Sequence, residues 1–367
     1  MVVDEEARDW SPAHPRSFGR NGAAAPKLTR MTTQSKEGPG DTWPRIRSLI
    51  DEVLSESWMN PFTSEMIRYQ TGTGGKRIRP AIVLGVHRAF GGDDARALPF
   101  AAAVEIIHNA SLVHDDIQDR DEQRRGRPSA WMKYSTDQAI NLGDILFTLA
   151  FEVFMRSPIS DRTKLEIVRL TMRAVAELVN GQVQEIVFRR GGEISVDDYL
   201  SMVNGKTGSL FRLASQGAYV LTENGADGCI EDLRRLGSCL GSMFQVRDDI
   251  IDIFGLKEGR EPGCDVMEGK ISVLTSLSMA KLDPDERRDL LAMLCSPRER
   301  KDRALVEKVT GLYRRTGAYR EAYGIYQRER QQVFSIPVMK DNKRLEGFVQ
   351  EIVDHLSVPL DRLSPDF

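Results

Sequence analysis

The stretch PFAAAVEIIHNASLVHDDIQD, residues 99–119, combines an apolar helical pattern with a cluster of aspartates at its end. Its apolar residues recur at intervals of three and four, which is typical of an α-helix packed against others. The same spacing recurs in residues 43–54, 140–154, 163–188 and 231–255. We find no convincing alternating pattern of a strand, and Gly and Pro cluster between the helical segments. The sequence therefore predicts an all-α fold of about ten helices.

Composition narrows the class of protein. The 51 basic and 54 acidic side chains leave a formal net charge of -3, so nothing in the overall charge favours nucleic acid as a partner. Four cysteines without a CxxC pair favour reduced thiols in the cytoplasm over disulfides or structural zinc. No apolar run approaches the ~20 residues of a transmembrane segment. Residues 1–40 lack periodicity and predict a disordered extension, and residues 41–367 predict a single folded domain.

The first aspartate cluster consists of Asp115, Asp116 and Asp119, near the carboxyl end of the predicted helix. Asp115 and Asp119 are one turn apart and project from one face. Carboxylates this close repel each other, and the negative end of the helix dipole adds to the cost. A divalent cation would reverse that cost, and an all-oxygen ligand set suits Mg²⁺. A solvated acidic helix end is the alternative for one such motif taken alone.

A second cluster, FQVRDDIIDIFG, repeats the pattern as Asp248, Asp249 and Asp252, again where an apolar helix ends. Two copies in matching contexts favour facing helices whose carboxylates converge and bind metal from two sides. Gln245 precedes Asp249 by one helical turn and is expected on the same side.

Two glycine-containing basic loops accompany the aspartates. GTGGKRIRP, residues 72–80, contains Lys76 and Arg79, and RRGRP, residues 124–128, contains Arg124 and Arg125. Together they favour binding of two diphosphates, one through metal and one directly by Arg and Lys. Solvated surface arginines remain the alternative for each loop taken singly. For His108 the alternative is a core histidine, and for NGKTG, with Lys206 and Thr207, it is a plain loop.

Residues 74–270 resemble the trans-isoprenyl diphosphate synthase (polyprenyl synthetase) family, which includes geranylgeranyl and farnesyl diphosphate synthases. The resemblance is carried by GGKRIRP, HNASLVHDDIQD with RRGRP after it, GQVQE, KTGSLF, FQVRDDIID and EGK. It implies the isoprenoid synthase fold, a single-domain helical bundle around a central cavity, and a homodimer. It also implies a prenyltransferase that condenses isopentenyl diphosphate with dimethylallyl, geranyl or farnesyl diphosphate.

The resemblance assigns roles to individual residues. The Mg²⁺ cluster, of three ions with substrate bound, would be held by Asp115, Asp119 and Asp248, supported by Asp116, Asp249 and Asp252. The allylic diphosphate would be held by Arg124, Lys206 and Lys270, and isopentenyl diphosphate by Lys76, Arg79, His108 and Arg125. The allylic cation would be stabilised by Thr207, Gln245 and the carbonyl of Lys206. Arg260 replaces a lysine that the family commonly has and is a further substrate-binding candidate.

Small residues before the first aspartate bear on the length of the product. Farnesyl-type members resemble one another in bulky aromatics four or five positions before this aspartate, where this chain has Ser111 and Ala110. The floor of the tunnel is then expected deeper, at Ile107 or Val104, or at phenylalanines of the neighbouring helix. Because an aromatic would overfill the tunnel, its absence predicts a geranylgeranyl product, with farnesyl or longer chains as alternatives.

Two other classes of protein share parts of this pattern. A class I terpene cyclase also ionises an allylic diphosphate, but usually carries an NSE-type second metal motif rather than a second DDxxD. A noncatalytic subunit of a heteromeric prenyl synthase usually has eroded aspartates, whereas all six are intact here. The pattern therefore favours the synthase.

Overall fold

The computed structural model describes residues 42–56, 58–191, 194–223, 228–255, 262–361 and 363. The predicted extension, residues 1–40, and Arg260 lie outside these residues. Within them the regular structure is helical apart from two strands of two residues each. The predicted all-α class is confirmed.

The described helices and strands follow in chain order. The first half contains α1 (Thr42–Leu54), α2 (Pro61–Thr71), α3 (Ile78–Ala89), α4 (Asp94–Asp119), β1 (Gln123–Arg124), β2 (Arg127–Pro128), α5 (Ala130–Tyr134), α6 (Thr136–Met155) and α7 (Asp161–Phe188). The second half contains α8 (Val196–Val203), the π-helix η1 (Asn204–Gly208), α9 (Ser209–Val220), α10 (Gly228–Phe254), α11 (Cys264–Glu268), α12 (Val273–Met279) and α13 (Pro284–Cys295). The chain continues through the 3₁₀-helix η2 (Arg298–Arg300), α14 (Arg303–Thr316), α15 (Ala318–Ser335), α16 (Pro337–Asp341) and α17 (Lys343–Asp361).

The five long helices predicted from periodicity correspond to α1, α4, α6, α7 and α10. The prediction of about ten helices was too low, because helices of five residues, such as α5, α11 and α16, are too short to show a period.

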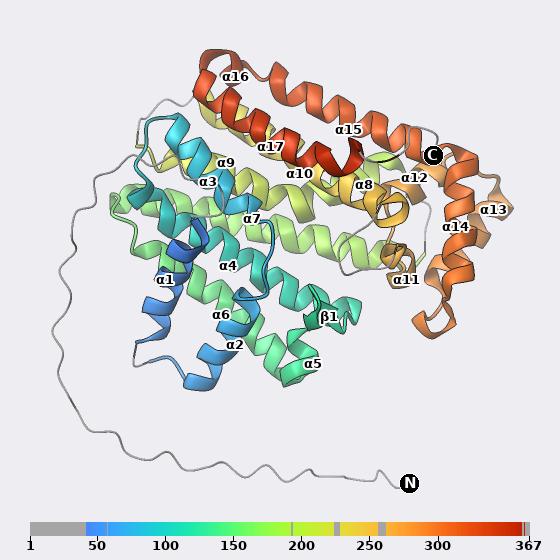
Figure 1. Ribbon diagram of the computed structural model, residues 1–367, viewed down its shortest axis with the longest axis horizontal. Helices are drawn as coiled ribbons and strands as arrows, with labels where there is room; N and C mark the ends of the chain where they lie inside the picture. Colours follow the sequence, from blue (N-terminus) through green and yellow to red (C-terminus); the bar gives the residue numbers. More distant parts are fainter. Residues whose placement is uncertain are drawn as a thin grey trace, which may run out of the picture. The chain divides into compact units, whose positions relative to one another are not determined.

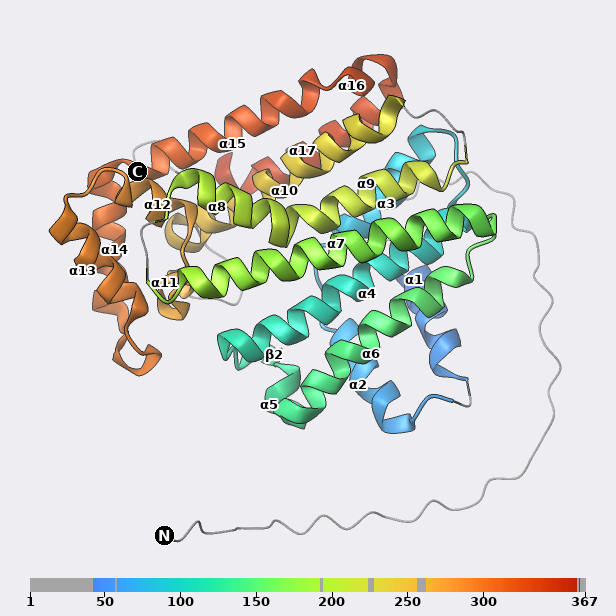
Figure 2. The ribbon, with the colours of Figure 1, turned by 180° about the vertical axis from the view of Figure 1, so that it is seen from behind.

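Helix α9 lies at the centre of the bundle and contacts α3, α4, α7 and α10. Helix α4 also packs against α6, and α15 and α17 cover α10 (Figures 1 and 2). The buried apolar residues form one continuous core. The carboxyl ends of α4, α7 and α10 lie at the same end of the bundle (Figure 2). Side chains that are more than a hundred residues apart in the sequence can therefore meet there.

Helix α6 departs from the prediction that no segment is long and apolar enough for a membrane. It is 20 residues long and passes a test of length and composition, with 44% of its apolar window buried. It packs against α4 and α5 within the bundle. One such helix is weak support for a membrane segment, because core helices of soluble proteins pass the same test.

Two segments predicted as loops have regular structure. NGKTG forms the π-helix η1, which joins α8 to α9 without a break. RRGRP forms a tight antiparallel hairpin of β1 and β2. Its turn residues Arg125 and Gly126 have φ values of 53° and 75°, as a two-residue hairpin turn requires. The hairpin turns Arg124 back towards the end of α4.

Candidate active site

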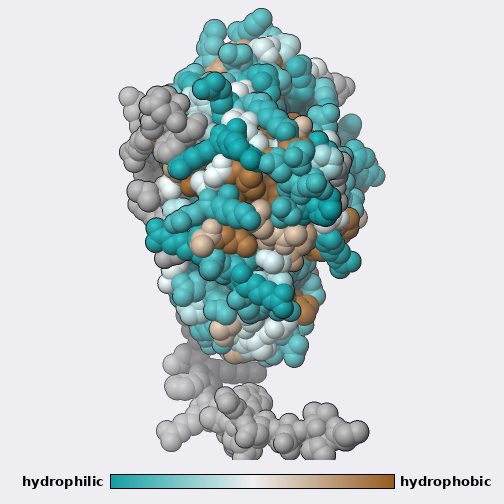
Figure 3. All heavy atoms as spheres, turned by 90° about the vertical axis from the view of Figure 1, so that its right-hand side faces the viewer, coloured by the Kyte–Doolittle hydropathy of each residue, from teal (hydrophilic) through white to brown (hydrophobic). Residues whose placement is uncertain are grey.

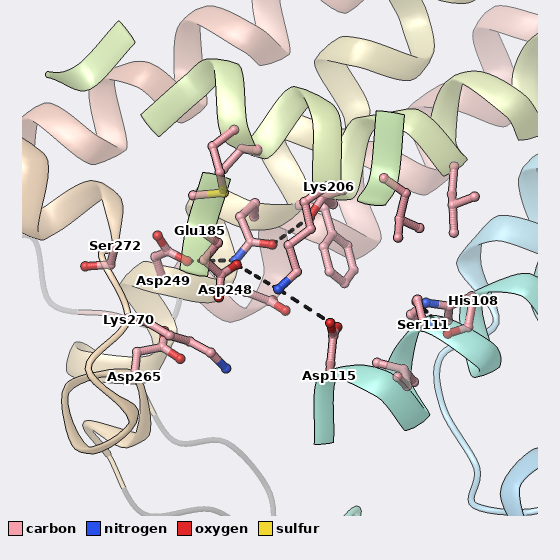
Figure 4. A pocket seen from close by; sticks show the side chains of 18 of the residues that line it. His108, Ser111, Asp115, Glu185, Lys206, Asp248, Asp249, Asp265, Lys270 and Ser272 are labelled. Carbon is pink, nitrogen blue, oxygen red and sulfur yellow. Dashed lines mark hydrogen bonds and ion pairs between the residues drawn. The ribbon is translucent and has the colours of Figure 1, made fainter. Parts of the chain in front are cut away.

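A cavity of about 230 Å³ lies among α4, α7, η1 and α10. Its polar lining includes the predicted residues Arg79, His108, Ser111, Asp115, Arg124, Lys206, Thr207, Gln245, Asp248, Asp249 and Lys270. Figure 4 shows Asp115 on one wall, Asp248 and Lys206 opposite, and Lys270 beside Asp265. The surface at the end of the bundle near α13 and α14 is mostly hydrophilic, with smaller hydrophobic areas between (Figure 3). Seven predicted residues do not line the cavity: Lys76, Ile107, Ala110, Asp116, Asp119, Arg125 and Asp252.

The three aspartates of the first motif face different partners. Asp115 points into the cavity, where its Oδ2 lies 3.9 Å from Lys206 Nζ. Asp116 is fully buried and accepts a hydrogen bond of 2.8 Å from Arg124 Nε in the hairpin. Asp119 accepts one of 2.6 Å from Arg189 Nη1. The helix ends directly after these residues, because Arg120 adopts a left-handed conformation with φ 55°.

Charges of opposite sign alternate along the cavity wall. Lys206 Nζ lies 2.7 Å from Glu185 Oε2 and so bridges Glu185 and Asp115 (Figure 4). Burial alone would raise the pKa of Glu185, but Lys206 and Arg189 outweigh it and lower the pKa to about 2. For Asp115, burial outweighs the attraction of Lys206 and raises the pKa. Asp115 is thus a carboxylate whose charge is poorly compensated by the protein.

The three aspartates of the second motif differ in their exposure and in their hydrogen-bond partners. Asp248 lines the cavity, its side chain is 31% exposed, and it pairs with Arg247. Asp249 is buried, and its carboxylate accepts hydrogen bonds from Tyr199 OH (2.6 Å) and Val273 N (2.8 Å). Asp252 accepts one of 3.0 Å from the backbone N–H of Asp265. Asp249 and Asp252 therefore anchor neighbouring segments around Asp248.

A chain of hydrogen bonds orients Gln245. Its Oε1 accepts from Thr207 Oγ1, and its Nε2 donates to Asp249 Oδ1, both at 2.9 Å. Thr207 belongs to η1, which packs closely against α7 at Gly181. A Cβ added at Gly181 would lie only 2.2 Å from the backbone N of Lys206, the residue before Thr207. Glycine in α7 therefore lets η1 approach closely.

The predicted basic residues are only partly brought together. Arg79 lines the cavity with its guanidinium 4.9 Å from the Phe211 ring, and burial lowers its pKa to about 10. Burial and the charge of Arg79 lower the pKa of His108 well below its usual range, so its imidazole is neutral near pH 7. Arg125 instead donates to the carbonyl of Gly74. Lys76 is exposed outside the lining.

The proposed chain-length residues differ in their access to the cavity. Ser111 lines it, and its hydroxyl donates 2.8 Å to the carbonyl of His108. Ala110 and Ile107 are buried and do not line it. The apolar wall is completed by Leu112 of α4 and by side chains of other helices: Leu178, Met202, Val203, Leu210 and Phe244.

Five polar residues that line the cavity or border it were not predicted as site residues: Glu185, Arg189, Tyr199, Asp265 and Ser272. Glu185 and Arg189 follow Gln182 at intervals of three and four, so a polar stripe at the end of α7 was a usable signal. Tyr199 and Asp265 carry no comparable signal, because folding alone brings α8 and α11 to the cavity.

The carboxylates suit a hard divalent cation. Asp115 and Asp248 line the cavity from two helices, and Asp119 follows Asp115 by one turn. Carboxylate atoms of Asp119, Asp121 and Glu268 lie within 4.8 Å of one another. These donors are all oxygens, which is the chemistry that Mg²⁺ prefers. The donor set therefore fits the predicted metal.

Comparison with known proteins places the chain in a family. The profile of polyprenyl synthetases matches residues 60–312. A short chain isoprenyl diphosphate synthase of Methanothermobacter thermautotrophicus is 31% identical over 77% of this chain and 84% of its own. A geranylgeranyl diphosphate synthase of Saccharolobus solfataricus is 33% identical over 70% and 77%. The crystal structure of a geranylgeranyl pyrophosphate synthetase from Pyrococcus horikoshii superposes with a TM-score of 0.74, covering 86% of this chain and 98% of its own at 29% identity. The chain belongs to the polyprenyl synthetase family.

Proposed function

We propose that the protein is a trans-prenyltransferase that condenses isopentenyl diphosphate with an allylic diphosphate to make an all-trans prenyl diphosphate. The observation that carries the proposal is a single cavity lined by Asp115 and Asp248 from the two aspartate motifs and by Lys206 and Lys270. Relatives named as prenyl diphosphate synthases support the same reaction class. A cavity with carboxylates for metal and cations for phosphate suits a diphosphate leaving group.

The allylic diphosphate is held at the end of the cavity where the two motifs lie. Bound at Asp115, Asp119 and Asp248, Mg²⁺ would supply Lewis-acid stabilisation of the departing diphosphate. Lys206, Lys270 and Arg124 donate hydrogen bonds to its oxygens and stabilise the charge that grows as the C–O bond breaks. Ionisation leaves a delocalised allylic cation in the apolar part of the cavity.

Side chains of the cavity then stabilise the allylic cation and direct its reaction with isopentenyl diphosphate. The Thr207 hydroxyl donates a hydrogen bond to Gln245 Oε1, so lone pairs on its oxygen remain for the cation. Arg79 and the neutral His108 hold isopentenyl diphosphate, whose double bond attacks the cation. The new carbon–carbon bond leaves the positive charge on the isopentenyl unit, and the released diphosphate takes the proton whose loss forms a new double bond. The apolar wall excludes water, which would otherwise trap the cation as an alcohol.

We propose a geranylgeranyl product. Ser111 lines the cavity on α4, and no Phe, Tyr or Trp side chain of α4 lines it. The growing chain can therefore pass this level, and we expect the buried Ala110 and Ile107 to lie beside its far end. A geranylgeranyl diphosphate synthase among the relatives supports this length.

An assay separates the synthase from a terpene cyclase. Purified protein is incubated with Mg²⁺, ¹⁴C-isopentenyl diphosphate and dimethylallyl, geranyl or farnesyl diphosphate, and products are sized after phosphatase treatment. The synthase yields labelled prenols, mainly of twenty carbons. A cyclase instead yields unlabelled hydrocarbon from the allylic diphosphate alone. Absence of labelled prenol with every primer would refute the proposal.

A homodimer is supported by an exposed apolar stripe on α7. Leu165, Met172, Val179, Val183 and Val187 are exposed and recur at intervals of seven and four, so they lie on one side of the helix. An apolar stripe of this kind is typical of a buried interface. The double variant Val179→Glu, Val183→Glu should be monomeric in light scattering, and a wild-type monomer would contradict the homodimer.

A further inference from the structure

Arg189 directly follows α7 and extends its guanidinium to the end of α4. Its Nη1 lies 2.6 Å from Asp119 Oδ1, and its Nη2 pairs with Glu185. The other oxygen of Asp119, Oδ2, lies 3.0 Å from Lys270 Nζ. Both oxygens of this expected metal ligand are therefore engaged by cations of the protein.

The three expected metal ligands differ in this respect. The cation next to Asp115 is Lys206, whose Nζ lies 3.9 Å from Asp115 Oδ2 but only 2.7 Å from Glu185 Oε2. Asp248 pairs with its chain neighbour Arg247 and keeps 31% of its side chain exposed. Asp119 keeps only 2% of its side chain exposed. Asp119 is thus the ligand for which a metal ion must compete most directly with the protein.

Arg189 can release Asp119 without becoming unpaired. Its second nitrogen is already bound to Glu185, whose pKa of about 2 keeps it ionised. Lys270 would be drawn away by a diphosphate, for which it is a proposed ligand. A free divalent cation is repelled by Arg189, Lys206 and Lys270, whereas a metal ion complexed with diphosphate carries net negative charge and is attracted.

We infer that Arg189 is a positioning residue that competes with the divalent cation for Asp119, so that metal binds tightly only together with a diphosphate. The inference rests on the proposed function for the identity of the ligand. It assigns to Arg189 the selection of the metal–diphosphate complex over the free metal ion.

The test measures metal binding without turnover. Binding of Mn²⁺ is followed by the electron paramagnetic resonance signal of the free ion, with and without inorganic diphosphate, for wild type, R189Q and R190Q. Arg190 is the matched control, because it is the next residue in the chain and carries the same charge, but its side chain is exposed. We expect R189Q to bind Mn²⁺ roughly three- to tenfold more tightly without diphosphate. R190Q should match wild type, and diphosphate should shrink or reverse the difference.

Unchanged or weaker binding of Mn²⁺ by R189Q would overturn the inference, as would equal effects of R189Q and R190Q. In an Asp119→Asn background R189Q should have no effect, and an undiminished effect there would also overturn it. If R189Q does not fold, R189K should bind Mn²⁺ more tightly than wild type, because the single ammonium cannot bridge both carboxylates. The readout needs no prenyl transfer, so a protein without transferase activity could still pass this test.

Discussion

Asp249 is predicted to be essential for stability although it belongs to a metal-binding motif. Its carboxylate accepts from Tyr199 OH, Val273 N and Gln245 Nε2 at 2.6, 2.8 and 2.9 Å. Asp249→Asn keeps the shape but places an N–H₂ group against one of these donors and removes the charge that strengthens the other bonds. A hydrogen bond to a charged group contributes about 1.5–3 kcal/mol, and a buried donor left unpaired costs about 1–3 kcal/mol. We expect a loss of about 3 kcal/mol in the free energy of unfolding.

The measurement is thermal and urea unfolding in EDTA, so that metal binding does not contribute. For a folded part of about 330 residues the loss corresponds to a decrease in Tm of about 4–5 °C. Asp115→Asn is the matched control, because it makes the same chemical change at a carboxylate whose nearest cation is 3.9 Å away. Its Tm should stay within about 1 °C of wild type. An unchanged Tm for Asp249→Asn, or an equal loss for both variants, would refute the division of roles within the second motif.

Three further predictions concern the cavity wall and η1. Ser111→Phe should shorten the main product, and an unchanged length in the radiolabel assay would place the floor elsewhere. Gly181→Ala should lower kcat strongly and cost about 1–3 kcal/mol, because its Cβ would lie 2.2 Å from Lys206 N; wild-type kcat would argue against the tight fit. Glu185 has a pKa lowered from 4.5 to about 2, so it stabilises the fold above pH 4.5 and loses this effect as the pH falls towards 2. Glu185→Gln should therefore lose stability at pH 7, and its difference from wild type in urea unfolding should shrink below pH 4.5; a difference independent of pH would contradict the lowered pKa.

Helical periodicity identified the long helices because each buries an apolar face along its whole length. It could not predict η1, since NGKTG has two glycines that read as a break. The segment is helical because Gly181 and Gly241 let α7 and α10 pack directly on its backbone, a contact between distant parts of the sequence. Short helices such as α11 were missed for a different reason, because five residues are too few to show a helical period.

The sequence also identified most of the polar residues that line the cavity, but not which partner each of them contacts. The resemblance gave Asp116 and Asp249 a supporting role, and the structure turns Asp116 towards the hairpin and Asp249 towards Tyr199. Asp248 likewise has a partner in the scaffold, the fully buried Arg247. Such partners depend on which helices are neighbours, which the spacing within one helix does not reveal.

The central claim is that Asp115 serves the leaving diphosphate rather than the fold. The direct test is incorporation of ¹⁴C-isopentenyl diphosphate into prenols, with farnesyl diphosphate as primer, by wild type, Asp115→Asn and the exposed control Asp289→Asn. We predict labelled geranylgeraniol from wild type and Asp289→Asn, and at least a hundredfold lower rate for Asp115→Asn at an unchanged Tm, the order of loss seen when one transition-state contact is removed. Full activity of Asp115→Asn, or no labelled prenol from wild type, would contradict the account.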